Sequence, residues 1–84
     1  MDNSELAILF VTIHDVMAAE QALKQAGLWC DLVPTPRQLS SDCGMAVLTK
    51  PDELASVRET LEQGGLEHQG IYQLSQDGYH RIVD

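Results

Sequence analysis

The sequence predicts an α+β fold in which a sheet and two helices form a two-layer α/β sandwich. Two short segments, residues 6–11 and 45–48, are apolar at every position, as buried strands are. A helix-start signal follows each segment, and the amphipathic stretch after it ends at glycine. A short strand-like segment follows the first helix, and a more polar one follows the second. With 84 residues, the chain has room for one hydrophobic core.

The first half of the chain predicts a strand, a helix and a second strand. Residues 6–11 are apolar on both alternating faces, which indicates a central strand buried on two sides. Thr12 and Asp15 then have the spacing of a helix N-cap and its first-turn acid. Apolar residues continue at helical spacing until Gly27, which ends the helix. Residues 29–33 form a short strand, closed by two prolines that cannot donate to a sheet ladder.

The second half repeats this order. Residues 45–48 predict another buried strand, and Thr49 and Asp52 repeat the helix-start spacing. The helix that follows ends at the glycine pair 64–65. Residues 66–74 are more polar and predict a strand at the edge of the sheet.

The resulting order of strand, helix, strand, strand, helix, strand is the ferredoxin-like βαββαβ pattern. We therefore expect residues 1–74 to form a single ferredoxin-like domain. The turn signal Asp77-Gly78 leaves two alternatives for residues 75–84: a C-terminal tail that frays, or a short added strand that folds back on the sheet.

Charge and hydropathy narrow the classes of partner. The chain has 5 Lys and Arg against 13 Asp and Glu, a net charge of −8 with neutral histidines. The basic residues are scattered, so we expect no nucleic-acid partner. No apolar segment is long enough to cross a bilayer, and residues 1–5 lack the basic head of a signal peptide. We expect no membrane partner and a cytoplasmic location, in which both cysteines would be reduced thiols.

Cys43 is the residue on which we expect any chemistry to occur. In the predicted topology the end of the first strand lies beside the start of the third, which brings Cys43 next to Thr12 and His14. The amino end of the first helix and the cation Arg37 would favour a thiolate there. Gly44 would leave the backbone beside the sulfur open to a large partner. The alternative is that Cys43 is a small, buried strand residue.

Cys30 and the histidines have other expected roles. Cys30 starts the second strand and would lie at the far end of the sheet from Cys43, about 10 Å away or more, beyond the span of a disulfide. We expect it to pack in the core, with a resolving thiol as the alternative. His14, His68 and His80 show no paired metal-ligand spacing, so we expect no metal site.

The stretch from Pro34 to Gly44, PTPRQLSSDCG, resembles a family of small bacterial proteins described as selenium/sulfur (Se/S) carrier protein-like. The resemblance extends over residues 6–72 and includes the ending Gly70-Ile71-Tyr72, whereas Cys30 lies outside the motif. It implies that Cys43 carries a persulfide or perselenide for transfer to a partner enzyme. The residues expected to surround that cysteine are Thr12, His14, Arg37, Ser40, Ser41 and Gly44.

The partners that the resemblance implies are a cysteine desulfurase or selenium-delivery enzyme and an acceptor enzyme, and no cofactor is implied. Two other functions stay open. One is a non-catalytic interaction or small-molecule regulatory module of ferredoxin-like fold. The other is a cysteine-based transferase in which His14 and an acid, Asp15 or Asp42, activate Cys43. A chain this small offers little room for a substrate pocket, so we expect a carrier and not an enzyme. Because residues 6–11 are apolar on both faces, a homodimer or a partner would cover the open sheet face.

Overall fold

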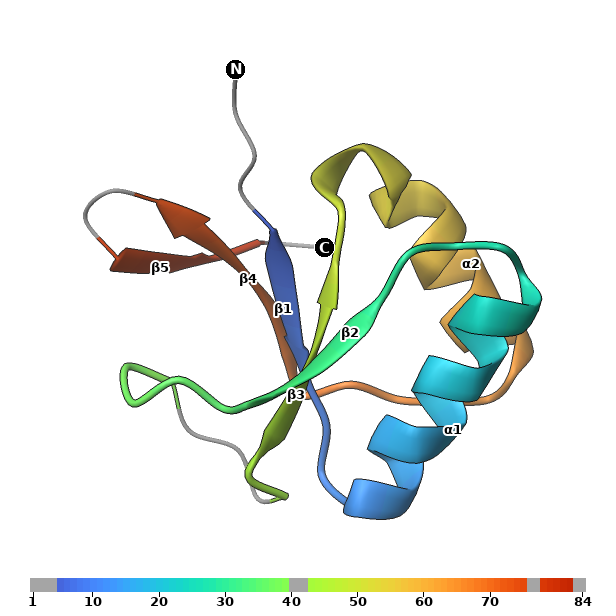
Figure 1. Ribbon diagram of the computed structural model, residues 1–84, viewed down its shortest axis with the longest axis horizontal. Coiled ribbons are helices and arrows are strands. Elements are labelled where there is room, and N and C mark those ends of the chain that lie inside the picture. The colour runs from blue at the N-terminus through green and yellow to red at the C-terminus, as the bar shows by residue number, and fades with distance from the viewer. Residues whose placement is uncertain (1–4, 40–42, 76–77, 83–84) are drawn as a thin grey trace.

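The computed structural model of the chain describes residues 5–39, 43–75 and 78–82, which form a five-stranded antiparallel sheet with two helices on one face (Figure 1). The strand order is β2-β3-β1-β4-β5. The order of the first four strands is that of a ferredoxin-like fold, as predicted, and β5 is an extra strand beside β4. The strands are β1 (Leu6–Leu9), β2 (Asp31–Pro34), β3 (Met45–Thr49), β4 (Gly70–Ser75) and β5 (Gly78–Arg81). The helices are α1 (Ile13–Gln25) and α2 (Leu54–Gln63), the latter preceded by a 3-10 turn, Pro51–Glu53.

The main core lies between the sheet and the helices. Alternate residues of β1 point toward the helices because strand side chains alternate between faces, and residues three or four apart on each helix point back. Its buried members are Leu6, Ile8, Phe10, Val16, Ala19, Leu23, Val47, Val57, Leu61 and Ile71. Within the described residues, neither helix has the length and apolar composition needed to span a membrane.

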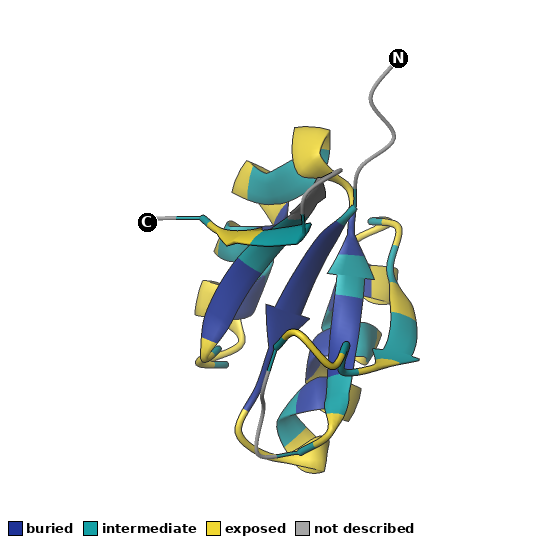
Figure 2. Cartoon of the chain, turned by 90° about the vertical axis from the view of Figure 1, so that its left-hand side faces the viewer, coloured by how far each residue is buried: buried dark blue, intermediate teal, exposed yellow. Residues whose placement is uncertain are grey.

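The opposite face of the sheet has a smaller core of its own. Ala7, Leu9 and Ala46 are buried there, in the dark blue centre of the sheet in Figure 2. Leu39 from the β2–β3 connection and Tyr79 from β5 pack against this cluster. Both faces of β1 are therefore buried within a single copy of the chain. A second copy over this face stays a prediction.

The first helix begins as the sequence predicts. Thr12 is the N-cap of α1, and its hydroxyl accepts a hydrogen bond from the backbone N–H of Asp15 at 3.1 Å. The second helix start was predicted wrongly. Thr49 ends β3, and its buried hydroxyl has no hydrogen-bond partner among the described residues. The chain instead enters α2 through the 3-10 turn that begins at Pro51, a residue suited to a first helical position.

The prediction of an edge strand over residues 66–74 was wrong at both its start and its place in the sheet. Leu66 lies just beyond α2 and helps to cap its end, because its N–H donates to the carbonyl of Leu61 at 2.9 Å while Gly65 adopts a φ of 68°. The strand starts only at Gly70 and lies inside the sheet, between β1 and β5. Of the two alternatives for the C-terminal residues, the added strand is the one that forms.

We predict that Thr12→Ala lowers the free energy of unfolding by about 1 kcal/mol, because the Asp15 amide loses its acceptor. Thr12→Ser keeps a hydroxyl and should stay close to the unmodified protein. Urea denaturation of the three proteins measures the difference. Equal stability of all three would show that the cap contributes nothing.

Gly70→Ala should destabilise the fold by about 1–3 kcal/mol, since a Cβ at this position would lie 2.9 Å from Cε1 of the Tyr72 ring. The Tyr72 ring would have to move, and it packs against the buried cluster on the open face of the sheet. Urea denaturation in a double-mutant cycle with Tyr72→Ala isolates this contact. If Gly70→Ala destabilises the Tyr72→Ala protein just as much, the contact with the Tyr72 ring is not the cause of the loss.

Candidate functional site

Cys43 lies immediately before β3, where that strand starts beside the end of β1. The register pairs Leu9 with Ala46, so the chain following Leu9 runs past the residues that precede Ala46. The sulfur donates to the carbonyl oxygen of Phe10 at 3.2 Å and to that of Met45 at 3.3 Å. The juxtaposition of these two strand ends, expected from the topology, is therefore present in the structure.

The thiol is on the helix side of the sheet. Met45 and Val47 belong to the main core or pack against it, and Cys43 continues their alternation by two residues. Its side chain is half-buried and contacts the edge of that core. Figure 1 shows that β3 starts at the same end of the molecule at which α1 starts. Cys43 is thus held at the margin of the core, at the end of the molecule where α1 begins.

Both contacts require the sulfur to carry its hydrogen, because the sulfur is the donor in each. A carbonyl oxygen is an acceptor, and a thiol has a single hydrogen, which the oxygens of Phe10 and Met45 share. To act as a nucleophile, Cys43 would have to lose this hydrogen, and with it both of these contacts. The contacts therefore describe a resting thiol.

Gly44 is required for its backbone conformation. Its φ is 75°, in the region that side chains rarely adopt, and its carbonyl accepts from the N–H of Thr35 at 3.0 Å. A Cβ at Gly44 would have no atom within 4 Å, so the space beside it is open. The bond to Thr35 extends the β2–β3 pairing and brings Cys43 back to the sheet.

The other predicted site residues have different positions. Thr12 serves as the helix cap, and His14 is exposed in the first turn of α1. Arg37 is exposed on the β2–β3 connection, in a turn where the N–H of Leu39 donates to the carbonyl of Pro36 at 3.0 Å. Thr12 and His14 follow the end of β1 that contacts Cys43, and Arg37 lies three residues beyond the end of β2. The predicted residues Ser40 and Ser41 lie outside the described residues.

Sequence reasoning missed the groups that hold the thiol. They are the main-chain oxygens of Phe10 and Met45, and because every residue has a carbonyl, no residue type reveals them. The exact register of β1 against β3 is the signal that would have found them. An antiparallel pair can be guessed from a pattern, but a shift of one residue changes which carbonyl faces the sulfur.

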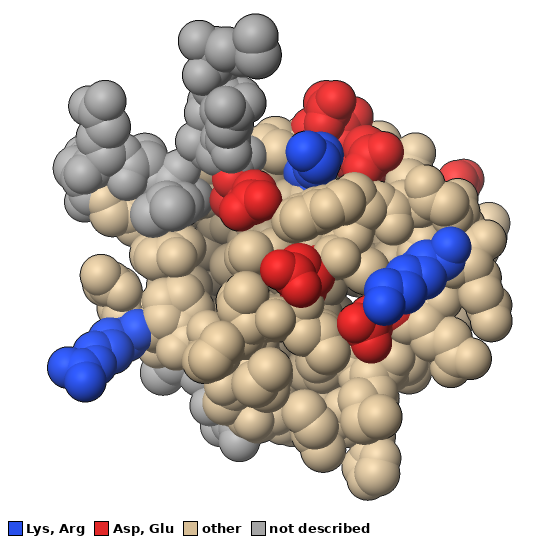
Figure 3. Space-filling view, viewed as in Figure 1, with Lys and Arg blue, Asp and Glu red and all other residues tan. Residues whose placement is uncertain are grey.

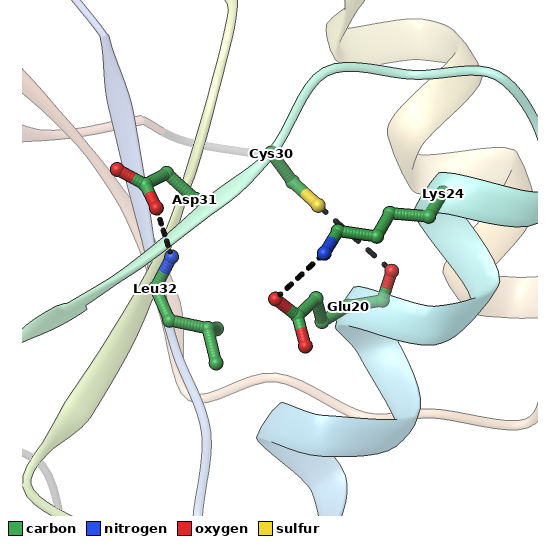
Figure 4. Close-up of polar contacts among 5 residues, drawn as sticks. All are labelled: Glu20, Lys24, Cys30, Asp31 and Leu32. Carbon is green, nitrogen blue, oxygen red and sulfur yellow. Dashed lines mark hydrogen bonds and ion pairs between the residues drawn. The ribbon is translucent and has the colours of Figure 1, made fainter.

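Cys30 has a different environment at the opposite end of the sheet (Figure 4). Its thiol points toward α1 and donates to the carbonyl oxygen of Glu20 over 3.8 Å. Burial raises the pKa of this thiol, the Glu20 carboxylate raises it further, and Lys24 acts in the opposite direction. Lys24 itself pairs with Glu20 at 3.3 Å. Cys30 is therefore a half-buried thiol that resists ionisation.

The two cysteines cannot reach each other. Asp31 pairs with Leu48, so Cys30 lies level with Thr49, six residues along β3 from Cys43. At the rise of a β-strand this is about 20 Å, several times the span of a disulfide. Both are thiols in the structure, as expected.

Metal ligands and surface hollows are the alternatives to a thiol site. In the described ranges, no group of three His, Cys, Asp or Glu side chains could hold a metal ion. A hollow of about 270 Å³ lies on the open side of the sheet. Its lining residues are Glu5, Val33, Pro34, Pro36, Leu48 and Tyr79. The sheet separates this hollow from the thiol of Cys43.

Comparison with known proteins gives one result for this chain. The family model described as "Putative Se/S carrier protein-like" matches residues 5–73, about four fifths of the sequence and everything from β1 to the middle of β4. No curated protein and no solved structure matches the chain.

Proposed function

The chain belongs to the family described as "Putative Se/S carrier protein-like", and from this premise and the position of Cys43 we propose that it carries sulfur or selenium on that cysteine. The observation that supports the proposal most directly is the half-buried Cys43 thiol, held by the carbonyls of Phe10 and Met45 at the edge of the core. A carrier needs a thiol that is fixed in place and still within reach of another protein. Both conditions fit this position.

Loading would be a thiol exchange. The Cys43 thiolate attacks the terminal sulfur of a cysteine persulfide on the donor enzyme. An S–S bond forms at Cys43 as the donor's S–S bond breaks, and the electron pair of the broken bond leaves on the donor's cysteine as a thiolate. The proton that Cys43 loses becomes available to that thiolate. The transferred sulfur keeps its oxidation state, so the step consumes no oxidant or reductant.

Delivery would be the same step in reverse. A nucleophile of the acceptor enzyme attacks the terminal sulfur, or a terminal selenium in a perselenide, and Cys43 leaves as a thiolate. The donor would be a cysteine desulfurase or a selenium-delivery enzyme. The chain would lend its thiol to the chemistry of both partners without catalysing a reaction of its own.

A second candidate function is a binding module for an apolar ligand or a second copy of the chain. The hollow of about 270 Å³ on the open sheet face favours it, because Val33, Leu48 and Tyr79 give it an apolar lining. In that function Cys43, on the other side of the sheet, would be incidental. Sulfur loading at Cys43 separates the two candidates.

We predict that incubation with a cysteine desulfurase and cysteine adds one sulfur atom to the protein, at Cys43. Intact-protein mass spectrometry under non-reducing conditions measures the gain, and peptide mapping assigns it. A parallel incubation with a selenium-delivery enzyme shows which element is accepted.

Cys43→Ser is the matched control for this experiment. A serine hydroxyl can donate to the same two carbonyls, so the fold should be kept while loading is lost. Loading that persists in Cys43→Ser, or that maps to Cys30, would overturn the proposal, and so would a protein that accepts no sulfur or selenium.

Cys30 should react slowly with iodoacetamide while the protein is folded. Its raised pKa leaves little thiolate near neutral pH, so its alkylation should set in at a more alkaline pH than that of an unperturbed thiol. Alkylation followed by peptide mapping from pH 7 to about 10 measures this, and unfolding in urea should raise the rate several-fold. Equal rates in folded and unfolded protein would contradict the burial argument.

A further inference from the structure

Large apolar side chains are exposed mainly at the start of α1. Among the described residues, four such side chains are exposed: Val11 (47%), Ile13 (42%), Met17 (58%) and Trp29 (39%). Ile13 and Met17 are four residues apart and share one face of the helix. Val11 directly follows Phe10, whose carbonyl accepts from the Cys43 thiol. We call Val11, Ile13 and Met17 the α1 collar.

The α1 collar has no charged side chains beside it on one face of the molecule (Figure 3), although Asp15 lies in the same first turn of α1 and Glu20 one turn beyond Met17. On the face drawn in Figure 3, the end of the molecule where α1 begins shows no Lys, Arg, Asp or Glu side chains, which lie higher on the molecule or to its side. The chain as a whole is strongly acidic, with 13 Asp and Glu against 5 Lys and Arg. An uncharged, apolar area on such a chain is a candidate contact surface for another protein.

We propose that the α1 collar docks the sulfur-donor enzyme, through an apolar area that surrounds the donor's persulfide cysteine and is bordered by basic residues. The inference rests on the proposed function of Cys43. The apolar part of the donor would contact Val11, Ile13 and Met17. Its basic border would be attracted by the net charge of −8 on this chain. Charge complementarity of this kind speeds encounter and orients the two proteins.

The location fits the geometry of transfer. The terminal sulfur of the donor has to approach the sulfur of Cys43 to within van der Waals contact, and Cys43 is half-buried against the core on its inner side. Its sulfur lies 3.2 Å from the Phe10 carbonyl, one residue before the collar begins. A donor seated on the α1 collar would therefore bring its cysteine near the thiol. A contact centred on three side chains suits a transient encounter between carrier and enzyme.

The experiment compares two sulfur donors on the double variant Ile13→Gln/Met17→Gln. A persulfide-bearing cysteine desulfurase must dock, whereas sodium polysulfide needs no docking surface. We expect the double variant to lose about tenfold in the rate of loading from the enzyme. Loading from polysulfide should be unchanged, which also shows that the variant is folded and its Cys43 reactive. Intact-protein mass spectrometry against time measures both rates.

Trp29→Gln is the matched control, because Trp29 is the fourth exposed apolar side chain and lies beside Cys30 at the far end of the sheet. It should load from the enzyme at the unmodified rate. Enzyme loading of the unmodified chain should also slow as salt rises, because screening weakens a basic border.

Several results would overturn the docking proposal while sulfur carriage stands. They are equal enzyme loading of the double variant and the unmodified chain, an equal loss in Trp29→Gln, enzyme loading that salt does not slow, or loading by polysulfide but not by the enzyme. Failure of both donors to load Cys43 in the unmodified chain would instead remove the proposed function, and the docking proposal with it.

Discussion

The burial of β1 on both faces is the constraint on which the rest of the structure depends. β1 lies between β3 and β4, and all four of its residues are buried, alternately under the helices and under the small core of the open face. The register of its neighbours is therefore strongly specified, because a slip of one residue would exchange the two faces. The same register aligns the Phe10 carbonyl with Cys43.

The two faces of the sheet divide the candidate functions between them. The thiol of Cys43 lies with the helices and the start of α1, while Leu39, earlier on the same β2–β3 connection, packs on the open face with Tyr79. The side chains of these two residues therefore pack on opposite faces of the sheet. A donor enzyme docked on the helix side, as proposed, would leave the hollow on the other side of the sheet accessible.

The sequence predicted the features that depend on local chemistry. The Thr12 cap, the glycine that ends α1 and the two buried strands follow from short-range rules, and each is present. The second helix start was wrong because Thr49 fits a cap by spacing, yet burial in β3 outweighs that preference. The edge position expected for β4 was wrong because it depends on whether the C-terminal residues pair, which a turn signal alone does not decide.

The site was predictable only in outline. Its cysteine and its glycine stand out in the sequence, and the topology brings Cys43 to the end of β1, but its acceptors belong to the backbone of Phe10 and Met45. Backbone acceptors affect how the site tolerates mutation during evolution. No replacement of the side chains of Phe10 and Met45 removes a main-chain oxygen, so the anchorage of the thiol survives sequence drift for as long as the β1–β3 alignment survives. Selection then acts on the sulfur itself, on the glycine that follows it, and on the packing that keeps β1 and β3 aligned.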